Sequence, residues 1–395
     1  MKAPRRLVAL GLLLASGLTP ALAHHRQTPE VLQYTNGGDV GLPRLPALGR
    51  TTVVFAVPSG ADQQVVTIQP FKDPSTLKPI GPAGDNRNPS ISFSGAIVAW
   101  DTDADPLNTG LPGRQIALAK KGILIQGPAD PSGTSQNPSL DVGGSRVAFE
   151  STGDLAGTGN PGLRQVFMRA PNGLITQVST GLGVSTNPVL SPKKHLLAFQ
   201  STSHPQTGLD TGVSQIWLGG IIATPPAAPI TGGLANSSNP SFSDDGAIMA
   251  FESRADLGGD QGDMGAPQIF IYHVKSKTFA QITNEPGGCT APAVARVKRD
   301  FPIGYVCGGI GYVYLLRADQ WNHLDTFAGS DTTRIIPEPG AHFFVVATTG
   351  NLLVGSGTTA GHQIYQVNSF KRPLTPVNKG YVAQWFPFRG LAPAK

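Results

Sequence analysis

The sequence contains little cysteine, little charge and no long apolar segment beyond its first residues. Its 395 residues include two cysteines, and charged residues make up 14% of the chain. Two cysteines are too few for a disulfide-rich scaffold, and no Cys-x-x-Cys spacing of a redox or zinc site occurs. After residue 18 no apolar run approaches the roughly 20 residues that a membrane-spanning helix requires. We therefore expect no transmembrane segment.

The first 23 residues have the features of a secretory signal peptide. Three basic residues precede an apolar run over residues 7–18, and Ala-Leu-Ala at 21–23 supplies the small residues of a cleavage site. We expect cleavage near Ala23, a periplasmic or secreted protein, and an N-terminal extension over residues 24–44.

The basic charge of the chain does not indicate nucleic-acid binding. The chain has 30 lysines and arginines against 25 aspartates and glutamates, and three of the basic residues lie in the expected signal peptide. The remaining 27 basic residues nearly balance the 25 acids, and no basic run carries interleaved aromatics. We expect no nucleic-acid partner and a monomer.

A four-copy repeat occupies the middle of the chain. Each copy starts with Asn-Pro and has an aromatic twelve residues later, followed after a segment of variable length by Gln and an apolar pair. The copies start at Asn88, Asn137, Asn187 and Asn239; the aromatics are Trp100, Phe149, Phe199 and Phe251; the glutamines are Gln115, Gln165, Gln215 and Gln268. A fixed period near 50 residues indicates stacked units that cannot bury their own faces alone.

One copy reads as four short strands joined by three hairpins. In residues 137–186 these strands are 138–142, 146–150, 165–169 and 174–178, with Gly-Gly and Asn-Gly turns between the first and last pairs. Repeated radially, this unit predicts an all-β fold, a β-propeller of four-stranded antiparallel blades. Seven units are expected over a single domain at 45–390, with six blades as the alternative. The units are 45–86, 87–135, 136–185, 186–237, 238–289, 290–335 and 336–388.

The two ends of the chain are expected to close the ring. Residues 51–57 and 64–69 resemble the second and third strands of a unit without an obvious first strand, whereas 381–388 is an unassigned strand at the far end. Pairing the C-terminal strand into the first blade would remove exposed sheet edges. We therefore expect closure by pairing of the N- and C-terminal strands.

The repeat resembles that of a known family. The segments NPSLDVGGSRVAFES at 137–151 and NPSFSDDGAIMAFES at 239–253 are similar to the TolB-type, WD40-like (PD40) propeller repeat, in which Pro-x-x-Ser-x-Asp-Gly precedes an apolar-Ala-Phe-x-Ser strand. The resemblance covers residues 88–290 and implies a propeller. The α/β domain that precedes the propeller in TolB itself has no counterpart here, and the family's Asp-Gly turn survives only at 245–246. Such repeats serve in scaffolds, binding proteins and peptidases, so the resemblance implies a fold rather than an activity.

One face of the propeller is the expected binding surface. Strand parity places the linkers into the first strands and the long loops 101–114, 150–164, 200–214 and 252–267 on the same side, which we call the loop face. Long loops on a rigid scaffold commonly carry binding residues. The candidates on this face are Asn88, Asn137, Asn187, Asn239, Asp103, Asp105, Asp154, Asp210, Asp256, Asp260 and Asp263.

Both groups of candidates have a structural alternative. The aspartates either ligate calcium, which takes six or more oxygen ligands, or are solvated loop residues; no loop has the spacing of a known calcium loop. Each Asn-Pro either contacts a ligand or shapes the entry to the first strand, since Asn readily hydrogen-bonds nearby backbone and Pro fixes φ. The glutamines are expected to bond loop backbone, and the aromatics to form the core between blades.

Cys289 and Cys307 are expected to form a disulfide. They flank a predicted strand–turn–strand unit, and export makes oxidation favourable. In the chain-entropy description a loop of this size gains about 3 kcal/mol.

No catalytic residues are identified from the sequence. A Gly-x-Ser-x-Gly elbow is absent, and the eight histidines have no metal-ligand spacing. The favoured interpretation is a noncatalytic exported propeller that binds a protein or a cell-envelope polymer through its loop face. The alternative is a propeller enzyme, such as a polysaccharide or glycan lyase, with its site over the central axis.

Overall fold

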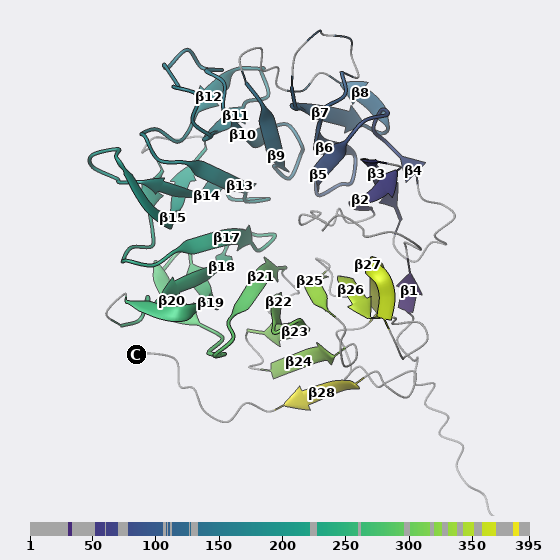
Figure 1. Ribbon diagram of the computed structural model, residues 1–395, viewed down its shortest axis with the longest axis vertical. Helices are drawn as coiled ribbons and strands as arrows, with labels where there is room; N and C mark the ends of the chain where they lie inside the picture. Colours follow the sequence, from purple (N-terminus) through teal and green to yellow (C-terminus); the bar gives the residue numbers. More distant parts are fainter. Residues whose placement is uncertain are drawn as a thin grey trace, which may run out of the picture.

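Seven antiparallel sheets are arranged around a central axis in a computed structural model of the protein (Figure 1). The all-β fold class and the seven blades expected from the repeat are confirmed. The structure describes residues 31–33, 52–59, 61–69, 78–105, 108, 110, 113–125, 127, 133–221, 227–259, 262–295, 301–316, 320–325, 331–337, 343–350, 358–368 and 382–386.

Blades 2 to 5 each contain four strands in chain order from the axis outward. Blade 2 comprises β5 (Asn86–Ile91), β6 (Ile97–Thr102), β7 (Gln115–Lys120) and β8 (Ile123–Ile125). Blade 3 comprises β9 (Ser135–Leu140), β10 (Val147–Ser151), β11 (Gln165–Arg169) and β12 (Ile175–Gln177). Blade 4 comprises β13 (Ser185–Leu190), β14 (Leu196–Ser203), β15 (Asp210–Gly220) and β16 (Ala228–Pro229). Blade 5 comprises β17 (Ser237–Phe242), β18 (Ile248–Ala255), β19 (Asp263–His273) and β20 (Thr278–Gln281).

The remaining three blades are less regular. Blade 1 comprises β2 (Val53–Ser59), β3 (Asp62–Ile68) and β4 (Lys78–Pro79). Blade 6 comprises β21 (Cys289–Val294), β22 (Pro302–Cys307), β23 (Ile310–Leu315), β24 (Gln320–Asp325) and β28 (Val382–Phe386). Blade 7 comprises β25 (Thr332–Pro337), β26 (Phe343–Gly350), β27 (Thr358–Asn368) and β1 (Val31–Gln33).

The strands that close the ring differ from the expectation. The C-terminal strand β28 does not pair with blade 1 but with β24, at the outer edge of blade 6. The N-terminal strand β1 instead pairs with β27 and completes blade 7. Both are edge strands, and any exposed strand edge offers the same backbone donors and acceptors. The short β1 carries too little apolar pattern to be recognised as a partner in advance.

The Asn of each Asn-Pro lies in a β-bulge of the first strand. The registers of β5, β13 and β17 with their partners shift across the Asn-Pro pair, and the asparagines have φ between 50° and 56°. This left-handed region is unfavourable for most residues but tolerated by Asn. The bulge therefore explains why Asn recurs, and Ala291 takes the same conformation in blade 6, with φ 58°.

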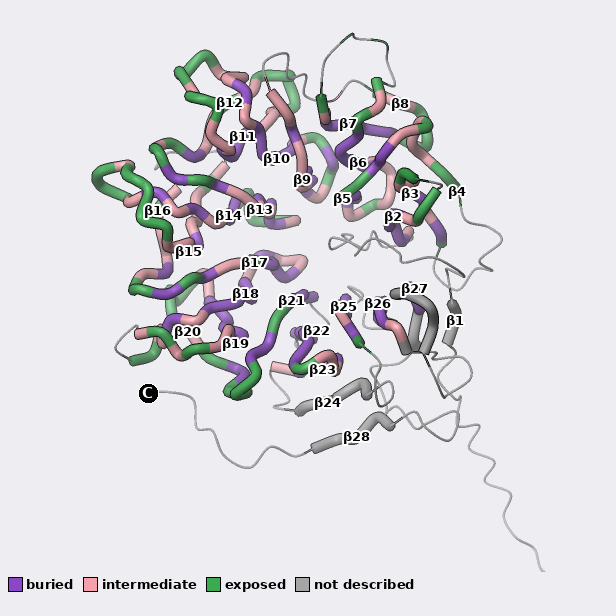
Figure 2. The backbone as a smooth tube through the Cα atoms, in the orientation of Figure 1, coloured by how far each residue is buried: buried purple, intermediate pink, exposed green. Residues whose placement is uncertain are grey.

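The repeated aromatics form the core between neighbouring blades, as expected. Phe149 of β10 packs with Ala99 and Ile116 of blade 2, and Phe199 of β14 packs with Ala148 of blade 3. All four repeated aromatics are at most 1% exposed, and buried segments run along the inner strands of these blades (Figure 2). Because each blade hides its aromatic against its neighbour, no blade buries its core alone.

The two ends of each blade form two distinct faces. At the loop face, the linker into a first strand bonds the loop between strands two and three, as in Thr152 N to Thr134 O at 3.2 Å. The opposite end, the hairpin face, contains the turns between strands one and two and between strands three and four. There Lys121 N donates to Ala96 O at 2.9 Å and Val274 N to Ala247 O at 3.0 Å. No helix among the described residues is both long and apolar enough to cross a bilayer.

Candidate functional site

The four repeated asparagines come together around the axis in a belt of hydrogen bonds that links neighbouring blades. Asn137 donates from Nδ2 to Glu150 Oε1 at 2.6 Å within blade 3. The same oxygen accepts the backbone N–H of Asn187 in blade 4 at 2.7 Å. In each copy the acceptor is the residue directly after the repeated aromatic. Because its side chain accepts hydrogen bonds from its own blade and from the next blade, it joins the two blades.

The belt runs through four acceptors. Asp101, Gln200 and Glu252 repeat the role of Glu150, each accepting an Asn side chain of its own blade and a backbone N–H of the next blade. Asn88 Nδ2 bonds Asp101 at 2.8 Å, Asn187 Nδ2 bonds Gln200 at 2.9 Å and Asn239 Nδ2 bonds Glu252 at 2.9 Å. The backbone partners are Asn137 N at 3.1 Å, Asn239 N at 3.2 Å and Ala291 N at 2.6 Å. These bonds give the asparagines a structural role.

The belt is interrupted in the other three blades. The strand register places Val306 at the acceptor position of blade 6, Ala347 in blade 7 and Ala56 in blade 1. None of these side chains accepts a hydrogen bond. In blade 7 the position of the repeated Asn is occupied by Arg334, which pairs with Ala347 in the register of β25 and β26. The axis is therefore chemically asymmetric.

An ion-pair cluster reinforces the belt at blade 2. Arg114 bridges Asp101 Oδ1 at 2.7 Å and Asp85 Oδ2 at 2.5 Å, and Arg87 Nε contacts Asp85 at 2.7 Å. Burial would raise the pKa of Asp85, but hydrogen bonds and charges from Arg87 and Arg114 outweigh it and hold the pKa below its usual value. Burial raises the pKa of Asp101 despite its bonds to Asn88, Asn137 and Arg114.

The loop aspartates mostly shape their own loops. Asp103 accepts the backbone N–H of Asp85 at 2.7 Å. The others accept backbone N–H groups two to five residues ahead, as Asp105 does from Gly110, Asp154 from Thr158, Asp210 from Gly212, Asp256 from Gly258 and Asp263 from Gly265. Asp260 lies outside the described residues. Such bonds are typical of Asx turns, and the structure does not bring these carboxylates together.

The described residues do not fit a metal site of the usual kind. Among them, no group of three or more His, Cys, Asp or Glu side chains is placed to hold a metal ion. We therefore derive no chemical step through a metal.

The repeated glutamines in the third strands of blades 3 to 5 anchor the linkers between blades. Gln268 Nε2 donates to Glu285 O at 2.7 Å, and its Oε1 accepts Thr283 Oγ1 at 2.9 Å. Gln165 makes the equivalent bonds to Gly183 and Ser179. Their partners lie in the segment after the fourth strand, which is the backbone that leads into the next blade.

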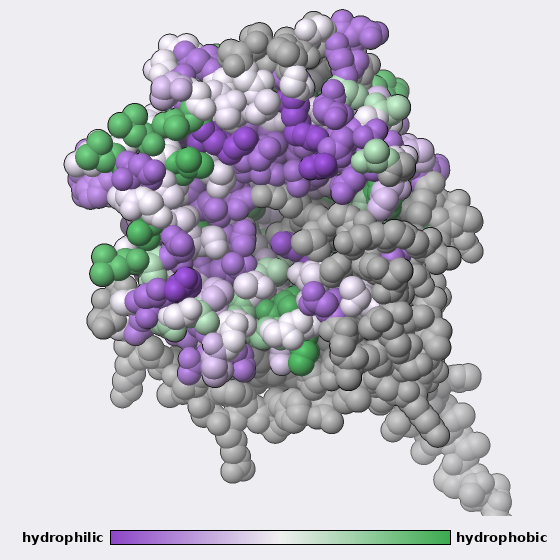
Figure 3. Space-filling model, viewed as in Figure 1, coloured by the Kyte–Doolittle hydropathy of each residue, from purple (hydrophilic) through white to green (hydrophobic). Residues whose placement is uncertain are grey.

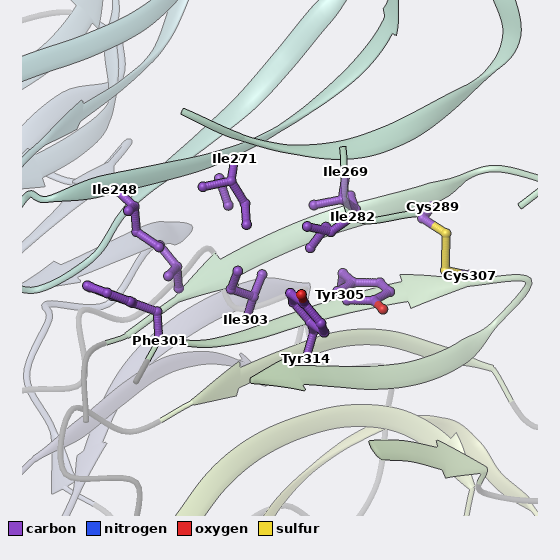
Figure 4. Packing of buried hydrophobic residues seen from close by; sticks show 12 residues of the cluster. Ile248, Ile269, Ile271, Ile282, Cys289, Phe301, Ile303, Tyr305, Cys307 and Tyr314 are labelled. Atoms are coloured by element: carbon purple, nitrogen blue, oxygen red, sulfur yellow. A yellow bond between two sulfur atoms is a disulfide. The ribbon is translucent and has the colours of Figure 1, made fainter. Parts of the chain in front are cut away.

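The expected disulfide between Cys289 and Cys307 is confirmed. The two residues pair directly across β21 and β22. They lie at the edge of the cluster in which blade 5 packs on blade 6, where Ile269 and Ile282 face Tyr305 (Figure 4). The bond therefore fastens a blade at its loop-face end.

A cavity lies on the axis beneath the belt. Its volume is about 190 Å³, and first strands of blades 2 to 7 form its wall. Asn187 and Asn239 lie at its belt end, and Phe93, Pro192 and Asp244 of the first hairpins lie at its other end. The charged residues that line it are Asp141, Asp244 and Arg334. Groups of both signs thus line space on the axis that a ligand can occupy.

The sequence did not identify Arg334 or the cavity. Arg334 falls in TTRIIP, which has no Asn-Pro and therefore no visible link to the repeat. Asp141 accepts Ser145 N at 2.7 Å and Arg146 N at 3.2 Å, so it is engaged in its own hairpin. Aligning the blades by strand register places Arg334 at the position of the repeated Asn, and this alignment would have identified it.

Comparison with known proteins identifies solved structures of the same fold. No protein-family model matches the chain, and no curated protein matches it in sequence. An oligogalacturonate lyase in complex with manganese superposes with a TM-score of 0.57 and 10% identity, covering 87% of this chain and 94% of the lyase. The oligogalacturonate lyase of Vibrio parahaemolyticus superposes with a TM-score of 0.55 and 9% identity, covering 86% of this chain and 97% of the lyase. TolB of Acinetobacter baumannii superposes with a TM-score of 0.46 and 11% identity, covering 81% of this chain and 64% of TolB.

These similarities correct the functional expectation. Structures that match nearly the whole chain are those of enzymes, which contradicts the noncatalytic scaffold and favours the alternative of a propeller enzyme. At such identities the likeness establishes the fold. The chain is thus similar in fold to oligogalacturonate lyase propellers.

Proposed function

We propose that this protein is a propeller lyase that cleaves an acidic glycan at the central axis. The observation that carries the proposal is the axial cavity with a guanidinium and a carboxylate in its wall, Arg334 and Asp244. The likeness of nearly the whole chain to oligogalacturonate lyases supports the choice of reaction.

Such a cleavage requires a proton acceptor and a cation that pairs with the sugar carboxylate. In β-elimination a base removes the proton from the carbon next to the sugar carboxylate. The glycosidic bond on the adjacent carbon breaks, a double bond forms, and the departing oxygen takes up a proton. A guanidinium paired with the carboxylate stabilises the charge that develops on it. Arg334 is proposed for this role, and Asp244, whose side chain also belongs to the cavity wall, is proposed as the proton acceptor.

Export of the protein is a second part of the proposal. The disulfide supports an oxidising compartment, because cytosolic thiols are usually kept reduced. Cleavage of the signal peptide near Ala23 stays a prediction. An extracytoplasmic location would give the enzyme access to polymeric glycans.

The test is a cleavage assay on soluble polygalacturonate and other uronate polymers, following the ultraviolet absorbance of the unsaturated product. We expect product from the wild type and a rate about a hundredfold lower in Arg334→Ala and Asp244→Asn. Arg254→Ala, which removes an exposed arginine of the loop face, is the matched control and should keep the wild-type rate. Thermal melts confirm that each variant is folded. Absence of product from every uronate polymer, or equal rates for Arg334→Ala and wild type, would overturn the proposal.

A further inference from the structure

The described residues of blades 2 to 5 carry opposite charge on the two faces. In the turns of blades 2 to 5 at the hairpin face, the described residues include eight lysines and arginines against three aspartates. The basic residues are Lys120, Lys121, Arg146, Arg169, Lys193, Lys194, Lys275 and Lys277, and the acidic residues are Asp141, Asp244 and Asp245. At the loop face of the same blades acids outnumber bases. They are Asp85, Asp101, Asp103, Asp105, Glu150, Asp154, Asp210, Glu252, Asp256, Asp263 and Glu285, against Arg87, Arg114, Arg164 and Arg254.

The basic residues of the hairpin face are largely available to solvent. Lys120, Lys121, Lys193, Lys194 and the two lysines of the last turn in blade 5 are all exposed. The aspartates make local contacts, since Asp141 contacts Arg146 at 3.5 Å and Asp245 Oδ1 accepts Ala247 N at 3.1 Å. The net positive field of this face is therefore only partly neutralised.

The basic face surrounds the hairpin end of the axial cavity. Lys193 Nζ lies 5.3 Å from the centre of the Phe93 ring. Lys193 belongs to blade 4 and Phe93 to blade 2, so this contact spans the hairpin of blade 3 beside the cavity. Phe93 and Pro192, the neighbour of Lys193, both line the cavity. Basic side chains of the turns thus reach the hairpin end of the cavity, where Asp141 and Asp244 also lie.

We infer that the hairpin face is a docking surface for a polyanionic glycan, which it guides into the axial cavity. Separated lysines on neighbouring hairpins fit the repeated carboxylates of a linear acidic chain, and Arg334 extends the same charge into the wall of the cavity. The inference rests on the proposed function for the choice of a glycan, but the binding itself needs no turnover. It also assigns the approach of the polymer to the face opposite the long loops.

A glycan fits this face better than a lipid surface. The described apolar residues that stand exposed near these turns are Ile123 and Ile125 of β8, which are 71% and 37% exposed, and Leu174 in the turn before β12, which is 60% exposed. Other exposed apolar residues, Leu182, Leu209 and Leu234, belong to the linkers and loop around blade 4 at the loop face. In Figure 3 apolar residues gather at the edge of the molecule over blade 4, whereas hydrophilic residues extend across blades 2 and 3. Insertion into lipid needs apolar and basic residues on one face.

The test measures binding of full-length protein to immobilised polygalacturonate, with neutral dextran as the negative polymer. We expect binding that weakens as salt rises, because screening shortens the range of the charges. Lys193→Gln/Lys194→Gln should weaken binding about tenfold. Arg87→Gln/Arg254→Gln removes the same number of exposed positive charges from the loop face and should leave binding unchanged. Equal affinity of the lysine variant and wild type would overturn the inference.

Two further outcomes separate this inference from the proposed function. If binding depends on the two lysines but no polymer is cleaved, the docking surface is supported and the proposed lyase activity is overturned. Cleavage together with binding that is unchanged in the lysine variant supports the lyase and overturns the docking surface. Vesicles containing phosphatidylglycerol form the last arm: capture by vesicles together with no binding to polygalacturonate would replace the glycan by a membrane and overturn the inference.

Discussion

Cys289 and Cys307 face each other across β21 and β22 at the register position where blades 4, 5 and 7 place a hydroxyl pair. Ser237 and Ser253 hold this position in blade 5, with their Oγ atoms 2.9 Å apart. The corresponding pairs are Ser185 with Ser201 in blade 4, at 2.8 Å, and Thr332 with Thr348 in blade 7, at 3.2 Å. The disulfide is thus a covalent version of a repeated hydrogen bond between the first two strands.

This equivalence predicts a mild consequence of removing the disulfide. The variant Cys289→Ser/Cys307→Ser should fold, because a serine pair already fits this position in blades 4 and 5. Its free energy of unfolding should fall by about 2–3 kcal/mol, the loss of the cross-link less the gain of a hydrogen bond. Urea unfolding under non-reducing conditions measures this change. A variant that fails to fold would show that the cross-link has no hydroxyl equivalent.

The belt predicts that Glu150 tolerates glutamine but not alanine. Glu150→Ala leaves Asn137 Nδ2 and the backbone N–H of Asn187 without their acceptor in a buried site, so unfolding free energy should fall by about 2–4 kcal/mol. Glu150→Gln keeps an acceptor oxygen, as Gln200 does naturally in blade 4, and should lose less than half as much. Denaturant unfolding of the two variants tests this order. Equal losses would contradict the role of the shared oxygen.

The bulge predicts a stabilising substitution in blade 6. Ala291 has a φ of 58°, where alanine is strained and asparagine or glycine is not. Ala291→Gly should raise the free energy of unfolding by up to about 1 kcal/mol. The matched variant Asn239→Ala introduces the same strain in blade 5 and removes a bond to Glu252, so it should be destabilised. The opposite order of melting temperatures would refute the conformational explanation of the repeat.

The cluster at Asp85 predicts a pH-dependent contribution to stability. The pKa of Asp85 is lowered in the folded protein, so its ionised form stabilises the fold above the unfolded pKa. This stabilisation is lost as pH falls from about 4 through the folded value. Asp85→Asn should therefore be less stable than wild type at neutral pH and nearly equal in strong acid. Unfolding free energies of both proteins across this range measure the difference, and a gap that persists in acid would contradict the ion-pair explanation.

Much of the scaffold was predictable because the residues of the repeat are set by packing and turn geometry within and between neighbouring blades. The aromatic at offset twelve must fill the space between blades, and the segment of variable length is a loop that tolerates insertion. The disulfide followed from two cysteines on paired strands. The belt was only half visible, since the sequence marks Asn137 but gives no sign that the acceptor Glu150 serves the next blade as well.

The sequence alone determined the blade and the cross-link and favoured seven blades over six, since each depends on short-range pattern and on the period of the repeat. Tertiary structure alone decided which terminal strand closes which blade, because all exposed strand edges offer the same hydrogen bonds. It also decided that Arg334 lines the axial cavity and that lysines and arginines from four blades share one face. Those positions depend on how blades are placed around the axis, and residues far apart in the chain meet there without any local signal.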